Sequence, residues 1–120
     1  MKILIAEDDE LILRTIEHKL VNEGFEVITS DNGKKAIEII KTTHPDVVIT
    51  DIMMPFASGI EILTAIQHLG INPTTIVLSS LGQEDIVEEA FLLGASDYMI
   101  KPFNPNELVL RIKRLVRVNR

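Results

Sequence analysis

The alternation of short apolar runs with amphipathic segments limits the fold of this chain more than any other feature of its sequence. Five runs rich in Ile, Leu and Val span residues 3–6, 25–28, 47–51, 75–79 and 97–100. Apolar residues at helical spacing follow each run, within residues 12–20, 36–40, 62–66, 84–93 and 107–118. Alternating β and α units predict right-handed crossovers and a parallel sheet covered on both faces. Five units are too few for a closed eight-stranded barrel, so we expect an open, doubly wound α/β fold.

The third apolar run is the best candidate for the centre of the sheet. Val47, Val48 and Ile49 form an unbroken β-branched stretch, which is typical of a strand buried on both faces. The run ends in Asp51, and Pro55 then stops regular pairing. Ligands of open α/β sheets bind at the carboxyl ends of the strands, so Asp51 is a candidate site residue.

Composition excludes several classes of function. With 120 residues and no cysteine, the chain is one domain without disulfides, thiol catalysis or Cys-type zinc sites. His18, His44 and His68 lack metal-ligand spacing. A net charge of −6 argues against nucleic-acid binding by this domain. The apolar start is too short for a signal peptide and no stretch could span a membrane, so we expect a cytoplasmic protein with no membrane partner.

Polar side chains stand at the ends of four of the five predicted strands. Parallel strands end at the same edge of a sheet, so these groups should converge; they are Glu7, Asp8, Asp9, Asp51, Ser79 and Lys101. Gathered carboxylates repel one another unless a cation intervenes, and an all-oxygen ligand set favours Mg²⁺. A lysine and a hydroxyl beside that metal suit a phosphoryl group, for which a carboxylate can be the acceptor.

Each of these residues also has an ordinary explanation when taken alone. Glu7 and Asp8 could belong to the start of a helix, where acidic residues are favoured. Asp51 could simply form a turn, and Ser79 and Lys101 could be solvated. The occurrence of all of them at strand ends in one short chain favours a phosphoryl site.

The same residues resemble the receiver domain of bacterial two-component response regulators, including the chemotaxis receivers. The resemblance covers essentially the whole chain and rests on the motifs at residues 3–10, 51–55 with Gly59, 78–80 and 94–103. It implies a flavodoxin-like three-layer (βα)5 sandwich with strand order 2-1-3-4-5.

The resemblance also implies roles for individual residues. Asp51 would accept a phosphoryl group from a sensor histidine kinase or a phosphotransfer protein. Mg²⁺ would be bound by Asp8, Asp51 and the backbone carbonyl of Met53, with Glu7 helping through water. Lys101 would pair with the phosphoryl oxygens, and its bond to the following proline would be cis.

A signalling switch follows from the same resemblance. Ser79 would bind the new phosphoryl oxygens, and Tyr98 would turn inward and relay the change to the surface of the fourth helix, fifth strand and fifth helix. The domain would be no enzyme beyond promoting its own phosphorylation and slow dephosphorylation. Met53 and Leu81 should flank the phosphoryl group, and neither can orient an attacking water. We therefore expect a long-lived aspartyl-phosphate.

The surface of the last two helices and the last strand suggests a homodimer. Asp97, Glu107 and Arg111 match the salt-bridged dimers of the DNA-binding winged-helix subgroup, but Val87 and Leu92 depart from that pattern. These two residues and Phe91 would make the fourth helix apolar outside, which favours a more hydrophobic contact. Alternatively, Phe91 packs into the core.

The chain ends in a basic stretch where receivers usually join an output domain. Its basic residues are Arg111, Lys113, Arg114, Arg117 and Arg120. They fit the solvated face of a last helix better than a nucleic-acid patch. The chain is either a stand-alone receiver or the start of a longer regulator.

Three other functions fit the sequence less well. A phosphatase of the aspartyl-phosphate type needs an acid/base Asp two residues after the nucleophile, where this chain has Met53. A nucleotide binder needs a Gly- or Ser/Thr-rich loop after the first strand, and here that loop is acidic. A receiver that no longer takes phosphate disagrees with the complete set of site residues.

Overall fold

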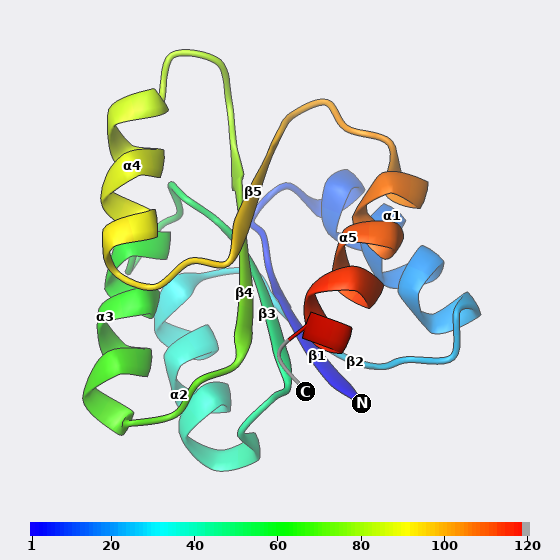
Figure 1. Ribbon diagram of the computed structural model, residues 1–120, viewed down its shortest axis with the longest axis horizontal. Helices are drawn as coiled ribbons and strands as arrows, with labels where there is room; N and C mark the ends of the chain where they lie inside the picture. The colour runs from blue at the N-terminus through cyan, green and yellow to red at the C-terminus, as the bar shows by residue number, and fades with distance from the viewer. Residues whose placement is uncertain (119–120) are drawn as a thin grey trace.

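The computed structural model describes residues 1–118, which form a three-layer α/β sandwich (Figure 1). The strands are β1 (Lys2–Ala6), β2 (Glu26–Ser30), β3 (Val47–Asp51), β4 (Thr74–Ser79) and β5 (Asp97–Ile100). The helices are α1 (Glu10–Asn22), α2 (Gly33–Thr43), α3 (Gly59–Leu69), α4 (Glu84–Leu92) and α5 (Pro105–Val118). All strand pairs are parallel in the order β2-β1-β3-β4-β5, which confirms the predicted doubly wound, flavodoxin-like sheet.

Two layers of helices enclose the sheet. Helices α1 and α5 lie together on one face, and α2, α3 and α4 cover the other (Figure 1). β3 serves both layers, because Val47 and Ile49 pack with the α1 and α5 side chains while Val48 packs with those of α2 and α3. This burial on both faces explains the unbroken β-branched run and confirms β3 as a central strand.

Short polar side chains start the first three helices. The side chains of Asp9, Asn32 and Ser58 are the N-caps of α1, α2 and α3, and each accepts a hydrogen bond from a backbone N–H in the first turn. Gln83 precedes α4 but makes no such bond.

Some predicted boundaries and exposures are wrong. The second strand begins one residue later than expected and continues to Ser30, because β2 pairs with β1 as far as Ala6. Val87 was expected on the exterior of α4 but is buried, since it faces the sheet together with Ala90. Of the basic C-terminal stretch, Arg120 lies outside the described residues. No helix within residues 1–118 is long and apolar enough to cross a membrane.

Candidate functional site

The carboxyl ends of β1 and β3 bring three carboxylates together. Ala6 pairs with Thr50, so the next residue after each, Glu7 and Asp51, lies at the same level of the sheet. Carboxylate oxygens of Glu7, Asp8 and Asp51 lie within 4.8 Å of one another. The predicted convergence of these acids is thus confirmed.

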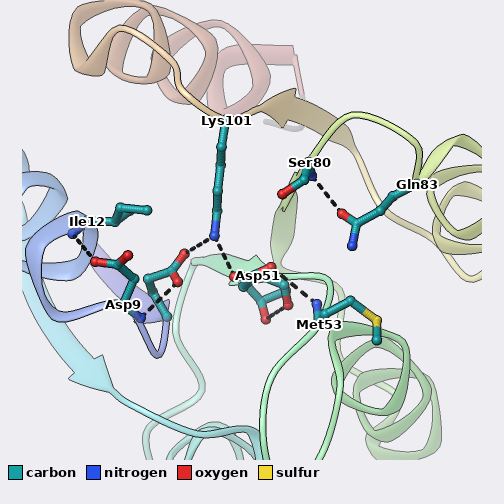
Figure 2. A network of polar contacts seen from close by, with 9 residues as sticks. Asp9, Ile12, Asp51, Met53, Ser80, Gln83 and Lys101 are labelled. Atoms are coloured by element: carbon teal, nitrogen blue, oxygen red, sulfur yellow. Dashed lines mark hydrogen bonds and ion pairs between the residues drawn. The ribbon is translucent and has the colours of Figure 1, made fainter.

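Lys101 lies between two of the carboxylates. Its Nζ is 2.5 Å from Oδ2 of Asp51 and 2.9 Å from Oε2 of Glu7. Figure 2 shows the Lys101 side chain extended toward Asp51. Its backbone N–H donates to the carbonyl of Ser79 at 2.7 Å, and the bond to Pro102 is cis, as predicted. One ammonium therefore serves two acids that come from different strands.

Among the charged groups of the site, the carboxylate of Glu7 has the least favourable surroundings. Its side chain is 0% exposed. Oε1 accepts the backbone N–H of Asp9 at 3.1 Å, but within residues 1–118 Oε2 accepts no bond of hydrogen-bond geometry, although Lys101 is near. Burial raises the pKa of Glu7 to about 7, and the contacts with Lys101 and Asp9 only partly oppose the increase.

The ammonium of Lys101 stays charged despite its surroundings. Burial acts to lower the pKa of Lys101, but hydrogen bonds and Coulomb attraction from Asp51 and Glu7 outweigh burial and raise it. One fixed positive charge therefore faces three acids, and the site is short of positive charge. A divalent cation would correct this imbalance.

Helix capping accounts for Asp9 but not for its two acidic predecessors. Asp9 accepts the N–H of Ile12 at 3.2 Å and so starts α1 (Figure 2). Glu7 instead faces Lys101, and Asp8 contributes its carboxylate to the acidic cluster. The residue that caps α1 is thus Asp9, and helix capping does not explain Glu7 or Asp8.

The position of Asp51 depends on a close backbone approach. A Cβ on Gly59 would lie 2.7 Å from the backbone oxygen of Asp51 and 2.9 Å from Cα of Ile52. Only glycine lets the start of α3 approach the end of β3 this closely. The Oδ1 of Asp51 accepts the N–H of Met53 at 3.2 Å, which helps to orient the carboxylate.

Ser79 and Tyr98 share a cavity beside the site. Ser79 is buried at the end of β4, next to the backbone of Lys101. A cavity of about 270 Å³ between α4 and β5 is lined by Ser79, Val87, Phe91 and Tyr98, among others. The ring of Tyr98 is partly exposed and meets Phe91 edge-on, with centroids 5.8 Å apart. Phe91 is therefore no core residue, and the apolar exterior expected of α4 holds for Phe91 and Leu92.

Two residues near the site were not found by sequence reasoning. Phe56 has φ of 64° and is 80% exposed, which is unusual for a bulky residue. Gln83 accepts the backbone N–H of Ser80 at 2.6 Å. Neither carries a sequence signal, because a loop dihedral and the direction of one side chain depend on how the loops pack.

The comparisons with known proteins agree with this geometry. Residues 3–113 match the family described as the response regulator receiver domain. The chain is 37% identical over 117 residues to the cell cycle transcriptional regulator CtrA of Caulobacter vibrioides, covering 98% of this chain and 51% of the relative. It is 33% identical over 116 residues to the alkaline phosphatase synthesis transcriptional regulatory protein PhoP of Bacillus subtilis, covering 97% and 48%.

Solved structures of similar fold include other receiver domains. The receiver domain of the Francisella response regulator 1452 has a TM-score of 0.91 and 34% identity, with 99% of this chain and 98% of that chain covered. The chemotaxis response regulator CheY4 of Vibrio cholerae has a TM-score of 0.87 and 28% identity, with 95% and 97% covered. The chain spans about half the length of the curated relatives it matches. Sequence, topology and comparisons agree that this chain belongs to the response regulator receiver domain family of two-component signalling proteins.

Proposed function

We propose that this domain is a phosphorylation switch in which Asp51 accepts a phosphoryl group from the phosphohistidine of a sensor kinase or phosphotransfer protein. The observation that carries the proposal is the contact of the Asp51 carboxylate with the Lys101 ammonium inside the acidic cluster. The nucleophile, a fixed positive charge and a metal-binding set of oxygens thus stand within one small site.

The transfer is an in-line displacement at phosphorus. A carboxylate oxygen of Asp51 forms the new P–O bond, the P–N bond to the donor imidazole breaks, and the imidazole nitrogen keeps the electron pair. Lys101 holds the carboxylate before the reaction and neutralises phosphoryl oxygens after it. Return to the resting state is hydrolysis, in which water attacks phosphorus, inorganic phosphate leaves and the carboxylate of Asp51 is restored.

The donor set fits Mg²⁺. Glu7, Asp8 and Asp51 offer hard oxygen ligands, and the buried Oε2 of Glu7 lacks a hydrogen bond. The backbone carbonyl of Met53 would complete the protein ligands. When bound, the metal supplies positive charge for the phosphoryl oxygens in transfer.

Ser79 and Tyr98 would carry the change to the surface. Ser79 lies at the end of β4 and also lines the cavity that Tyr98 borders. A hydroxyl drawn toward a phosphoryl group would open room in that cavity for the ring of Tyr98 to turn inward. The surface of α4, β5 and α5 would then change, which is where we place the contact with a second copy or a target.

The domain would be the receiver part of a longer regulator. Both relatives described above are named as transcriptional regulators, and each is about twice as long as this chain. On this proposal residues 1–120 form a single receiver domain, and a C-terminal output domain carries any nucleic-acid contact.

Intact mass after incubation with Mg²⁺ and acetyl phosphate tests the central claim. Wild type should gain the mass of one phosphoryl group, and Asp51→Asn should gain none. Asp46→Asn is the matched control, because Asp46 lies just before β3 at the opposite edge of the sheet, where it binds the N–H of Lys2. An unmodified wild type, or a modified Asp51→Asn, would refute the assignment.

A further inference from the structure

At the edge of the site, the side-chain amide of Gln83 accepts a hydrogen bond from the backbone N–H of Ser80. The N–H of Ser80 donates to Oε1 of Gln83 at 2.6 Å, shorter than the usual 2.9–3.0 Å of such bonds. Figure 2 shows this pair on the side of Asp51 away from Asp9, with Met53 also nearby. Ser80 directly follows Ser79, the last residue of β4.

Gln83 is poorly explained as a helix cap. It stands at the N-cap position of α4, yet its side chain bonds no N–H of the first turn, unlike the caps of α1, α2 and α3. Its amide oxygen turns back to Ser80 instead, while its backbone carbonyl accepts the N–H of Val87 at 3.0 Å. The side chain thus ties the first turn of α4 to the end of β4.

The N–H of Ser80 is placed to serve a phosphoryl group. Leu78 pairs with Asp51 across β3 and β4, so the backbone just beyond Leu78 borders the acceptor carboxylate. Lys101 contacts one oxygen of that carboxylate and the N–H of Met53 contacts the other. A phosphoryl group on Asp51 would project beyond both and present further oxygens to the end of β4.

We propose that Gln83 is a positioning residue that competes with the phosphoryl group for the N–H of Ser80. In the resting protein the amide oxygen of Gln83 holds this donor. After phosphorylation the donor passes to a phosphoryl oxygen, and Gln83 and the first turn of α4 are released. The inference rests on the proposed phosphorylation of Asp51 and adds a contact that opposes it.

The turn between β4 and α4 has room for Gln83 to move away from the N–H of Ser80. Gly82 has φ of 89°, and a Cβ built on it would meet no atom within 4 Å. Leu81 is also exposed, so the turn buries little that must be displaced. The cavity lined by Ser79, Ser80 and Tyr98 lies next to this turn. Breaking the bond between Ser80 and Gln83 therefore costs mainly the hydrogen bond itself.

The affinity for beryllium fluoride, a stable mimic of the phosphoryl group, tests the competition. Wild type, Gln83→Leu and Gln67→Leu would be titrated with beryllium fluoride and Mg²⁺ while backbone amides are followed by NMR. Gln83→Leu removes the competing acceptor, so its affinity should rise about two- to tenfold, the equivalent of one ordinary hydrogen bond. The resonance of the Ser80 amide should shift upfield in the free variant.

Gln67→Leu is the matched control. Its side chain donates to the carbonyl of Leu93 at 3.0 Å, at the opposite end of α4, so its loss should leave the affinity unchanged. Gln83→Glu keeps an acceptor and adds a negative charge, so it should bind beryllium fluoride more weakly than wild type.

The outcomes separate the two proposals. Wild type that binds no beryllium fluoride would overturn the phosphorylation of Asp51 itself, and the competition with it. Wild type that binds, with Gln83→Leu equal to it or weaker, would overturn the role of Gln83 alone. Equal affinity with lower stability would make Gln83 a purely structural residue.

Discussion

Glu7 accounts for most of the unfavourable free energy of burying charge in this site. A fully buried carboxylate beside a second carboxylate is stable only if it is paired or protonated. Lys101 is shared with Asp51, so it only partly compensates Glu7. The fold therefore holds a carboxyl group that gains from either a proton or a bound cation, which is the property a metal-dependent site requires.

Stability without divalent ions should fall as the pH rises through neutrality. The pKa of Glu7 is 4.5 in its ordinary state and about 7 in the folded protein. Between these values the folded chain holds a proton that the unfolded chain has released, so its advantage is present below about 4.5 and lost above about 7. Glu7→Gln mimics the protonated group and cannot titrate, so its stability should lack this pH dependence.

Urea unfolding in EDTA at pH 5 and pH 8 measures the effect. Relative to Glu7→Gln, wild type should lose on the order of 1–3 kcal/mol between the two pH values. Mg²⁺ should restore wild type at pH 8 and have little effect on the variant. If the free energy of unfolding depended on pH in the same way in wild type and in Glu7→Gln, the raised pKa could not be assigned to Glu7.

On the proposed phosphorylation of Asp51, Met53 would affect how long the phosphoryl group stays. Its side chain is exposed at the rim of the site and has no group that could orient water. Met53→Asn should therefore speed the loss of phosphate about three- to tenfold, as expected for one added hydrogen bond to the attacking water. Decay of the phosphorylated mass after removal of the phosphodonor measures the rate. Decay no faster than in wild type would count against a long-lived aspartyl-phosphate caused by Met53.

The loop after Asp51 is held by the start of α2. The N–H of Gly33 donates to the carbonyl of Pro55 at 3.3 Å. A Cβ on Gly33 would lie 1.9 Å from the backbone oxygen of Ala57, so the start of α2 lies directly against the backbone of this loop. The same loop holds Phe56 at its positive φ. The geometry near Asp51 thus depends on an element that contributes no side chain to the site.

Gly33→Ala should therefore damage both stability and phosphorylation. The clash is with backbone, which cannot rotate away, so we expect a loss of about 2 kcal/mol or more in the free energy of unfolding. Displacement of the loop should also slow phosphorylation of Asp51 by acetyl phosphate. Lys34→Ala, an exposed neighbour in the same turn, should change neither. Urea unfolding and intact mass give the two readouts, and a Gly33→Ala variant equal to Lys34→Ala would refute the argument.

The elements that the sequence predicts best are those whose pattern comes from burial on two sides. β3 was predicted to its last residue, because its side chains contact both helical layers. β2 pairs on one side only, so its polar end, Thr29 and Ser30, did not look like strand. Val87 was misplaced because α4 has only nine residues and more than half of them are apolar, so the sequence does not define which face of the helix is buried.

The convergence of the site could be predicted, but its internal contacts could not. Parallel strands must end at one edge, and this alone brings Glu7, Asp51 and Lys101 together. The burial of Glu7 and the bond between Ser80 and Gln83 depend on side-chain directions in loops. Such contacts follow from tertiary packing and leave no periodic trace in the sequence.

The face of the molecule formed by α4, β5 and α5 carries exposed apolar side chains between regions of opposite charge. Leu92 is 81% exposed, and Phe91 and Leu110 are exposed as well. α4 begins with Glu84 and Asp85, whereas basic residues lie along the outer side of α5. Arg111 already pairs within the chain, with Asp97 at 3.0 Å and Glu107 at 2.8 Å. Its charge is therefore largely compensated before any second copy approaches.

This arrangement predicts a phosphorylation-dependent dimer held mainly by apolar contact. Solution mass in beryllium fluoride and Mg²⁺ should rise toward twice that of the monomer. Because Arg111 is already paired with Asp97 and Glu107 within each copy, and the contact is mainly apolar, raising the salt concentration should not dissociate the dimer. A dimer held by ion pairs would instead weaken.

Substitution at Leu92 locates the contact. Leu92→Asp places an unpaired charge in the apolar contact and should keep the protein monomeric, without affecting the binding of beryllium fluoride. Val21→Asp is the matched control, because Val21 is 52% exposed near the end of α1, which is not one of the three elements of this face, and its variant should still dimerise. A wild type that remains a strict monomer would refute the dimer. A dimer that Leu92→Asp leaves intact would place the contact elsewhere. A dimer that dissociates at high salt would support the salt-bridged arrangement instead, from which this chain departs at Val87 and Leu92.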